Sequence, residues 1–212
     1  MPIIKELDSI TINKIAAGEV IDRPVSLVKE LVENSLDAGA TTIKIDIEDG
    51  GKKRIRVTDN GHGISKEDLK LATKRHATSK ITQLEDLYST SSFGFRGEAL
   101  ASICYVAKMD ITSKTEGYDT FHIYAYQDQL TDPKVVSGTI GTIIDVKDLF
   151  HDIPVRYQFL KTSATELSYI VEIVTHFSLS HPYINFVLTS HDKELINSTG
   201  ITDQKALLIH FY

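Results

Sequence analysis

Hydrophobic and polar residues along this chain follow two different periods, one typical of helices and one of strands. Between Val25 and Leu36, apolar residues recur close to every 3.6 positions, with Pro24 placed for a helix start and Gly39 for its end. Residues 10–36 are therefore predicted to be helical. Related signals predict further helices after Ser65, which is a typical N-cap, and over residues 97–106, 164–177 and 204–212.

Strict alternation predicts the strands. Residues 42–48 alternate, Asp49-Gly50-Gly51 follows as a turn, and residues 54–58 alternate again, which predicts a hairpin with one buried face. Further alternating stretches cover residues 108–114, 120–127, 139–146 and 185–195. Strands joined by hairpins, with helices gathered in other stretches, favour an α+β fold with a mixed, mostly antiparallel sheet covered on one face by helices.

Composition narrows the class of protein. The chain has 212 residues, 42% of them hydrophobic and 25% charged, which is typical of a globular protein and excludes a disordered tail, a collagen-like repeat or a coiled coil. Its net charge of −6 argues against a strongly basic, free-standing nucleic-acid binder. A single cysteine, Cys104, and the absence of a secretory signal or long apolar run predict a cytoplasmic protein, with Cys104 in the core.

The helix over residues 25–37 carries the first candidate chemistry. Ser26, Glu30, Asn34 and Asp37 share one polar face. Such a face is most often simply solvated. Alternatively, the amide oxygen of Asn34 is a hard ligand suited to Mg²⁺, and Glu30, one turn earlier, can orient and deprotonate a water molecule that attacks a phosphate.

A second candidate follows the hairpin, at Asp59-Asn60-Gly61-His62-Gly63. Asp, Asn and Gly dominate ordinary turns, so a turn is the simplest interpretation. The alternative is that Asp59 accepts a hydrogen bond from an amino group such as that of adenine, while Gly61 and Gly63 allow close approach to the backbone. The pattern is neither a Walker loop nor a Rossmann fingerprint.

Two later segments combine glycines, hydroxyls and cations. Arg75–Ile81 places two hydroxyls and three potential cations in a short stretch, and Ser92–Leu100 is a glycine-containing loop leading into a helix. A helix N-terminus has free N–H groups and a favourable dipole for anions, to which Lys80 and Arg96 would add charge. Either segment alone is more often a polar loop.

Together these segments carry a family resemblance. Glu30-x-x-x-Asn34, Asp59-x-Gly61-x-Gly63, the Gly94–Gly97 loop and Gly141-Thr142 resemble the four motifs of the GHKL ATPases, which have the Bergerat ATP-binding fold. Longer strings closely resemble the MutL family of DNA mismatch repair proteins: NKIAAGEVI at 13–21, KELVENSLDAGAT at 29–41, RHATSKI at 75–81 and GFRGEALASI at 94–103. The resemblance is clear over roughly residues 1–160.

The resemblance implies a role for each motif, with ATP and Mg²⁺ as ligands. Glu30 is the implied general base, Asn34 the Mg²⁺ ligand and Asp59 the acceptor for the adenine amino group, with Gly61, Gly63 and Thr142 near the base. The implied lid over the phosphates consists of Thr78, Ser79, Lys80, Gly94, Phe95, Arg96, Gly97, Glu98, Ala99 and Leu100.

The resemblance also implies an organisation and a set of partners. Residues 1–24 are expected to form an N-terminal arm and residues 25–212 the nucleotide-binding sandwich, with a second lobe and a C-terminal dimerisation domain outside this chain. The implied function is an ATP-hydrolysing switch that couples mismatch recognition to repair through ATP-driven dimerisation. The implied partners are a second MutL subunit, the mismatch-recognition protein MutS and, weakly, DNA, with no membrane; the isolated segment is expected to hydrolyse ATP very slowly.

Two other functions remain open at this point. The same residues suit a nucleotide-regulated interaction module with negligible turnover, or another GHKL ATPase such as a topoisomerase subunit. The chain also departs from the family it resembles, which usually has Asn where Asp152 stands and often Arg where Tyr157 stands. These departures concern local strand-to-helix geometry and DNA contact rather than ATP chemistry. The basic cluster formed by Lys52, Lys53, Arg54 and Arg56 is either a solvated hairpin tip or a contact for DNA phosphates.

Overall fold

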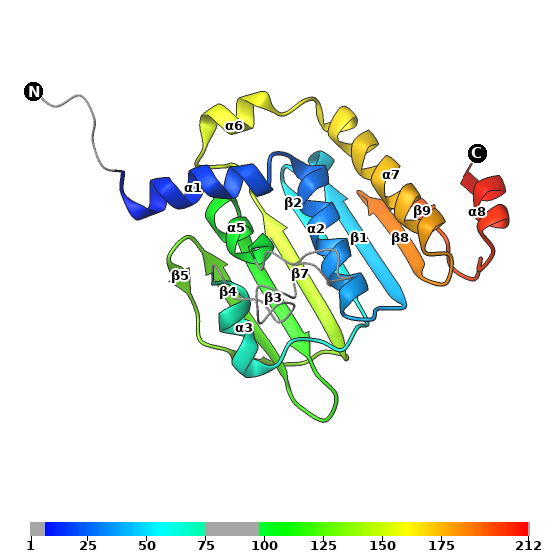
Figure 1. Ribbon diagram of the computed structural model, residues 1–212, viewed down its shortest axis with the longest axis horizontal. Helices are drawn as coiled ribbons and strands as arrows, with labels where there is room; N and C mark the ends of the chain where they lie inside the picture. The colour runs from blue at the N-terminus through cyan, green and yellow to red at the C-terminus, as the bar shows by residue number, and fades with distance from the viewer. Residues whose placement is uncertain (1–6, 75–97, 212) are drawn as a thin grey trace, which may run out of the picture.

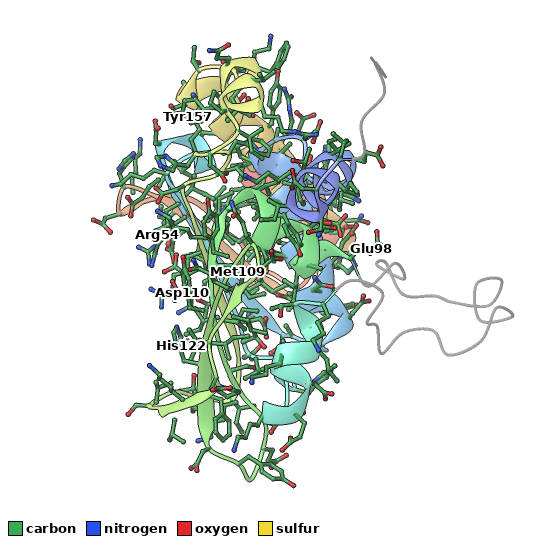
Figure 2. The ribbon with its side chains drawn as sticks, turned by 90° about the vertical axis from the view of Figure 1, so that its left-hand side faces the viewer. Arg54, Glu98, Met109, Asp110, His122 and Tyr157 are labelled. Carbon is green, nitrogen blue, oxygen red and sulfur yellow. The ribbon has the colours of Figure 1, made fainter. Side chains whose placement is uncertain are left out.

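A single mixed sheet forms the centre of the molecule, and the helices gather on one of its faces (Figures 1 and 2). The computed structural model describes residues 7–74 and 98–211. The nine strands follow the order β5-β4-β3-β7-β2-β1-β8-β9, with β6 also pairing with β4. Within the described residues, β1 and β8 are parallel and every other neighbouring pair is antiparallel. The predicted α+β class is therefore confirmed.

The elements have the following bounds. The strands are β1 Thr42–Glu48, β2 Arg54–Asp59, β3 Lys108–Lys114, β4 Thr120–Tyr126, β5 Gln129–Leu130, β6 Lys134–Val136, β7 Gly141–Lys147, β8 Asn185–Ser190 and β9 Lys193–Asn197. The helices are α1 Ser9–Val20, α2 Pro24–Asp37, the 3₁₀ turn η1 Asp49–Gly51, α3 Lys66–Ala72, α5 Ala99–Val106, α6 Pro154–Phe159, α7 Ser163–Ser180 and α8 Gln204–Phe211. No helix in this part of the chain is both long and apolar enough to cross a bilayer.

The stretch predicted to be helical over residues 10–36 contains two helices, and the second begins at Pro24, where the sequence places a helix start. The helical pattern over residues 10–36 breaks between Val20 and Pro24, where α1 ends and α2 begins. Proline disfavours helical geometry at the residue before it, and Arg23 is accordingly extended, with φ −160° and ψ 171°. Ile21 lies at this break and is fully buried. Because a buried apolar residue fits the helical spacing, the sequence pattern runs on through a position where the helix itself ends.

One predicted strand is also two. The alternating stretch over residues 185–195 contains a turn at His191 and Asp192, whose φ angles are +49° and +62°. Two successive residues of positive φ form a tight hairpin turn that matches the twist of the flanking strands. The polar His-Asp pair therefore separates β8 from β9 and pairs them antiparallel.

The core lies between the sheet and the helices. The predicted hairpin is confirmed, with β1 and β2 paired from Ile43 opposite Asp59 to Glu48 opposite Arg54. A slip of one residue would move every inward side chain to the other face, so burial of this set fixes the register. The buried inward residues of the central strands are Ile43, Ile45, Ile47, Ile55, Val57, Met109, Ile111, Ile144 and Val146. Cys104, 2% exposed, lies in this core as predicted.

Candidate functional site

The carboxylate of Asp59, at the end of β2, is held by hydrogen bonds from three separate elements. The Gly61 amide donates to Oδ1 at 2.9 Å, the Thr142 amide donates to Oδ1 at 3.3 Å, and the Ser35 hydroxyl donates to Oδ2 at 2.9 Å. Burial raises the pKa of Asp59 above its ordinary value, and the hydrogen bonds offset only part of this effect. A carboxylate kept in such a position despite its desolvation is typical of a functional site.

The carboxylate of Asp59 retains capacity for one more donor. An ionised carboxylate accepts about four hydrogen bonds, two at each oxygen. The amides of Gly61 and Thr142 use both positions at Oδ1, and Ser35 uses one at Oδ2. The remaining position suits an N–H group of a ligand, such as an exocyclic amino group, because an ionised carboxylate can accept but not donate.

Asp59 is the first member of a polar row across three neighbouring strands. Asp59 of β2 pairs with Thr142 of β7, and Thr142 pairs with Ser113 of β3. The alternation of each strand turns all three side chains toward the helix-covered face, where Thr142 is 5% exposed and Ser113 is 1% exposed. A row of polar side chains in an otherwise apolar layer marks this end of the sheet as the candidate site.

The glycines of the loop after β2 are required by backbone packing. Gly63 has φ +77°, and a Cβ atom there would lie 2.2 Å from the carbonyl oxygen of Lys114. At Gly61, a Cβ atom would lie 2.7 Å from the carbonyl oxygen of Ala38. The sequence predicted these glycines as positions where a ligand approaches the backbone. In the structure, the backbone of Ala38 and Lys114 lies close to these glycines, so the folded chain itself requires glycine at both positions.

Helix α2 is joined directly to this loop. Besides the bond from Ser35 to Asp59, the His62 amide donates to the carbonyl oxygen of Ala38 at 3.0 Å, just after the end of α2. Glu30 and Asn34 lie on the same helix and are half-buried. The structure therefore places the first two predicted motifs side by side, although they are separated by a complete strand hairpin in the sequence.

The predicted lid falls largely outside the described residues. This applies to Thr78, Ser79, Lys80, Gly94, Phe95, Arg96 and Gly97. Of the remaining three, Glu98 directly precedes α5, and Ala99 and Leu100 form its first turn. Helix α5 packs against α1, α2 and β3, and Figure 2 shows Glu98 on the helix side of the sheet.

Three site residues were missed by sequence reasoning. Ser113 belongs to the polar row, Ser35 of α2 donates to Asp59, and the side-chain oxygen of Asn60 holds the loop by accepting from the amides of Thr41 and Thr42 at 2.9 Å each. A signal existed for both serines, since each is a hydroxyl at an inward position of an apolar pattern. A buried hydroxyl at such a position requires a hydrogen-bond partner, and this requirement marks both serines as residues of a polar site.

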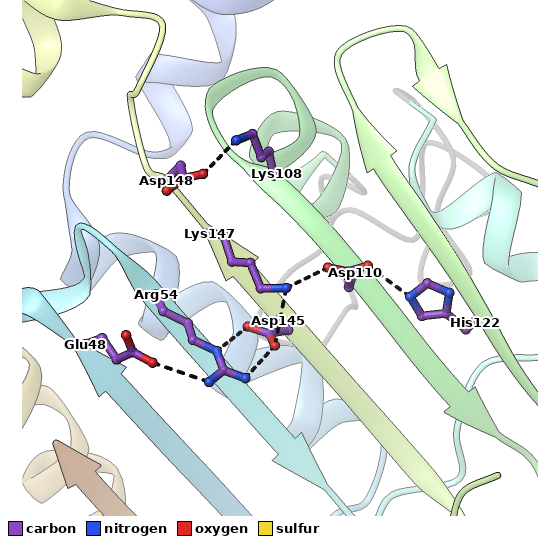
Figure 3. Close-up of polar contacts among 8 residues, drawn as sticks. All are labelled: Glu48, Arg54, Lys108, Asp110, His122, Asp145, Lys147 and Asp148. Carbon is purple, nitrogen blue, oxygen red and sulfur yellow. Dashed lines mark hydrogen bonds and ion pairs between the residues drawn. The ribbon is translucent and has the colours of Figure 1, made fainter. Parts of the chain in front are cut away.

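The opposite face of the sheet is charged and open (Figure 3). The Arg54 guanidinium binds the Asp145 carboxylate through two hydrogen bonds of 2.8 and 2.7 Å. Asp110 accepts from Lys147 at 3.1 Å and contacts His122 at 2.9 Å. Two members of the predicted basic cluster are thus engaged by carboxylates, since Lys53 also pairs with Glu48 at 2.6 Å.

Asp152 connects the N-terminal arm to the loop before α6. Its Oδ2 atom lies 2.5 Å from Lys14 Nζ of α1 and 2.5 Å from Gln127 Nε2. Partial burial raises the pKa of Asp152, but the hydrogen bonds from Lys14 and Tyr126 outweigh it, so the pKa lies below its ordinary value. Helix α6 still begins at Pro154, so strand-to-helix geometry is formed despite the unusual aspartate.

The donor atoms determine what cation this site suits. In residues 7–74 and 98–211, no three His, Cys, Asp or Glu side chains come together as a metal site. A Mg²⁺ ion takes few protein ligands and keeps several waters. A single amide oxygen from Asn34 is compatible with that chemistry only if phosphate oxygens and water complete the coordination.

Comparison with known proteins relates this geometry to a family. Residues 23–146 match the family described as histidine kinase-, DNA gyrase B-, and HSP90-like ATPase. The chain is 48% identical to the DNA mismatch repair protein MutL of Halothermothrix orenii over 94% of this chain and 31% of that protein. It is 46% identical to MutL of Staphylococcus carnosus over 99% of this chain and 32% of that protein. The chain thus spans about a third of the length of these curated relatives.

Two solved structures have the same architecture. The Aquifex aeolicus MutL ATPase domain complexed with ADP superposes with a TM-score of 0.72 and 32% identity, covering 91% of this chain and 69% of that one. The N-terminal domain of a DNA repair protein superposes with a TM-score of 0.79 and 27% identity, covering 95% and 60% of the two chains.

Proposed function

The chain belongs to the MutL family of histidine kinase-, DNA gyrase B- and HSP90-like ATPases, and we propose that the polar row around Asp59 is its ATP site. The GHKL fold and the MutL resemblance expected from the sequence are both confirmed by these relatives. The observation that carries the proposal is the Asp59 carboxylate, which is half-buried, fixed by three donors and able to accept one more.

Adenine recognition follows from the chemistry of Asp59. Its open acceptor position at Oδ2 receives one N–H of the adenine amino group. Guanine has a carbonyl oxygen at the equivalent position, which would face a carboxylate with no proton to share. The predicted contacts of Gly61 and Thr142 with the base are supported by their amides at this carboxylate, and the contact of Gly63 stays a prediction.

Helix α2 supplies the groups for hydrolysis. Asn34 would provide an amide oxygen for a Mg²⁺ ion bound with the triphosphate, and that ion would neutralise charge on the phosphate oxygens. Glu30, one turn earlier on the same helix, orients and deprotonates the attacking water. Both residues are half-buried on the helix that Ser35 joins to Asp59, so base recognition and phosphate chemistry depend on one element.

ATP binding also provides the switch of a mismatch repair protein. In this function the arm of residues 1–24 packs against a second MutL subunit in an ATP-dependent dimer, and the full protein works with MutS and contacts DNA weakly. Supporting this, α1 and the residues before it carry large exposed apolar side chains, at Leu7, Ile12 and Ile15. Exposed apolar residues grouped on one segment are typical of a protein–protein contact.

The test separates the roles of the two helix residues. We expect Asn34→Ala to abolish equilibrium binding of a fluorescent ATP analogue in the presence of Mg²⁺. Glu30→Ala is expected to retain binding and to slow single-turnover hydrolysis by roughly 10²–10⁴-fold, the range for loss of a general base. Equal loss of binding in both variants would contradict this division of roles.

A further inference from the structure

We propose that Ser113 determines nucleotide specificity by fixing the direction of the Thr142 hydroxyl, so that this hydroxyl accepts hydrogen bonds from the base and does not donate to it. The proposal rests on the ATP site proposed above and names a positioning residue within it. Ser113 lies in β3, next to Thr142 of β7 and one strand further from Asp59.

The argument begins with the protons around Ser113. Its Oγ atom lies 3.0 Å from the carbonyl oxygen of Gly141, 2.8 Å from the amide nitrogen of Ile64 and 3.0 Å from Thr142 Oγ1. A carbonyl only accepts and an amide only donates, and the hydroxyl of Ser113 has a single proton. We assign that proton to the Gly141 carbonyl, which can only accept, and with this assignment Ser113 accepts from the Ile64 amide and from the Thr142 hydroxyl.

Burial keeps this arrangement in place. Ser113 is 1% exposed and Thr142 is 5% exposed, so water has little access to replace a lost partner. Leaving a buried donor or acceptor unpaired is more costly than the net gain from a typical hydrogen bond. In this arrangement the Ile64 amide donates to Ser113 and Ser113 donates to the Gly141 carbonyl, so every buried group has a partner. The Thr142 hydroxyl then donates its proton to Ser113.

A consequence follows for the neighbouring base. With its proton directed to Ser113, Thr142 presents lone pairs only, beside the acceptor-only carboxylate of Asp59. Two acceptors side by side suit an amino group, which has two N–H donors, and oppose a carbonyl oxygen. Without Ser113, the Thr142 hydroxyl would be free to rotate and donate to a carbonyl.

The experiment compares ATP with inosine triphosphate, which has a carbonyl where adenine has its amino group. Dissociation constants of both are measured on the full protein by competition with a fluorescent ATP analogue. We expect Ser113→Ala to lower the preference for ATP over inosine triphosphate by about five- to tenfold, the value of about one hydrogen bond. Ser113→Thr keeps the hydroxyl and is expected to keep the wild-type preference.

A protein carrying Thr142→Val is the control in which the effect of Ser113→Ala is measured again. Once the Thr142 hydroxyl is removed, a second change of Ser113→Ala should leave the ATP preference unaltered, because Ser113 then has no hydroxyl to direct. If Ser113→Ala does not fold, Ser113→Cys is used instead, since a thiol is a weak hydrogen-bonding group and should shift the preference in the same direction.

The outcomes separate this inference from the proposed function. A wild-type protein that binds neither nucleotide would overturn the ATP site itself, and one that binds both equally would overturn adenine recognition by Asp59 and, with it, the role of Ser113. A wild-type protein that prefers ATP, with a Ser113→Ala variant that weakens both nucleotides equally, would leave the ATP site in place and overturn the role of Ser113. An equal shift in the Thr142→Val background would overturn it as well.

Discussion

The two faces of strands β2, β7 and β3 carry polar residues of very different kinds. On the helix-covered face, the half-buried Asp59 and the buried Thr142 and Ser113 form a row joined by hydrogen bonds. On the open face, the same three strands carry ion pairs, including Arg54 with Asp145 and Lys147 with Asp110 (Figure 3). Strand alternation alone separates the two sets.

The two faces differ in the free-energy cost of removing one partner of a polar pair. On the buried face, removing one partner leaves another group unpaired and away from water, which is costly. On the open face, water and salt screen each ion pair, and an exposed pair contributes little. We therefore expect substitutions on the buried face to change nucleotide binding and stability strongly and those on the open face to change them weakly.

Among substitutions on the two faces of the sheet, the largest effect is expected for Asp59→Asn. The amide replaces an acceptor-only oxygen with a donor, and the loss of a buried hydrogen bond to adenine should weaken ATP binding by about 10- to 100-fold. Isothermal titration with ATP measures this. An unchanged ATP affinity would show that the carboxylate does not contact the base.

The same substitution should have the opposite effect on stability. The introduced amide can donate to Ser35 Oγ, which then donates to the Leu31 carbonyl 3.1 Å away, so no partner is lost. Because burial raises the pKa of Asp59, protonation favours the folded state. This stabilisation is full below the unfolded-state pKa and is lost as the pH rises through the folded-state pKa. The variant should therefore become more stable than wild type as the pH rises through the folded-state pKa of Asp59. Denaturant unfolding of both proteins at several pH values measures this difference.

Ser35→Ala is expected to have the next largest effect. The single proton of the Ser35 hydroxyl faces Asp59 Oδ2 at 2.9 Å and the Leu31 carbonyl at 3.1 Å, and the substitution removes this donor from both acceptors. We expect a loss of about 1–3 kcal/mol in the free energy of unfolding and a several-fold loss in ATP affinity. The matched control is Ser178→Ala, another buried helical serine, whose hydroxyl donates to the Val174 carbonyl of the preceding turn at 2.9 Å. Equal losses in the two variants would mean that the contact with Asp59 contributes nothing.

On the open face, Arg54→Gln should have a smaller effect. The guanidinium and the Asp145 carboxylate are 29% and 14% exposed, so the pair is only partly removed from water. We expect a loss of about 0.5–1 kcal/mol, which decreases as salt is added, with ATP affinity unchanged. Denaturant unfolding at low and high salt measures the loss of stability, and titration with ATP measures the affinity. A loss larger than that of Ser35→Ala would reverse the comparison between the faces.

The smallest effect is expected for His122→Gln, at the edge of the charged face. Asp110 keeps its contact with Lys147, so one partner remains after the substitution. A surface change of this kind should alter the free energy of unfolding by no more than about 0.5 kcal/mol. A thermal melt of the variant beside wild type tests this, and a clear loss of stability would show that the charged network acts as a unit.

Local patterns in the sequence were sufficient for most elements and for the main candidate residues. Alternation over residues 42–48 and 54–58 predicted the β1–β2 hairpin, and Pro24 predicted the start of α2. Motif spacing identified Glu30, Asn34 and Asp59 as candidates without any structure. These features depend on residues close in the chain, where periodicity and turn chemistry act directly.

Tertiary structure alone decided which of these residues meet. Asp59 and Thr142 are 83 positions apart, and Ser113 and Thr142 are 29 apart, yet strand pairing places all three in one row. The order of strands in a sheet depends on long-range pairing and on burial of one face, neither of which is visible in a local pattern. For this reason the sequence by itself identified Asp59 as an acceptor, whereas the partners that hold it and the direction of the neighbouring hydroxyl follow only from the packed sheet.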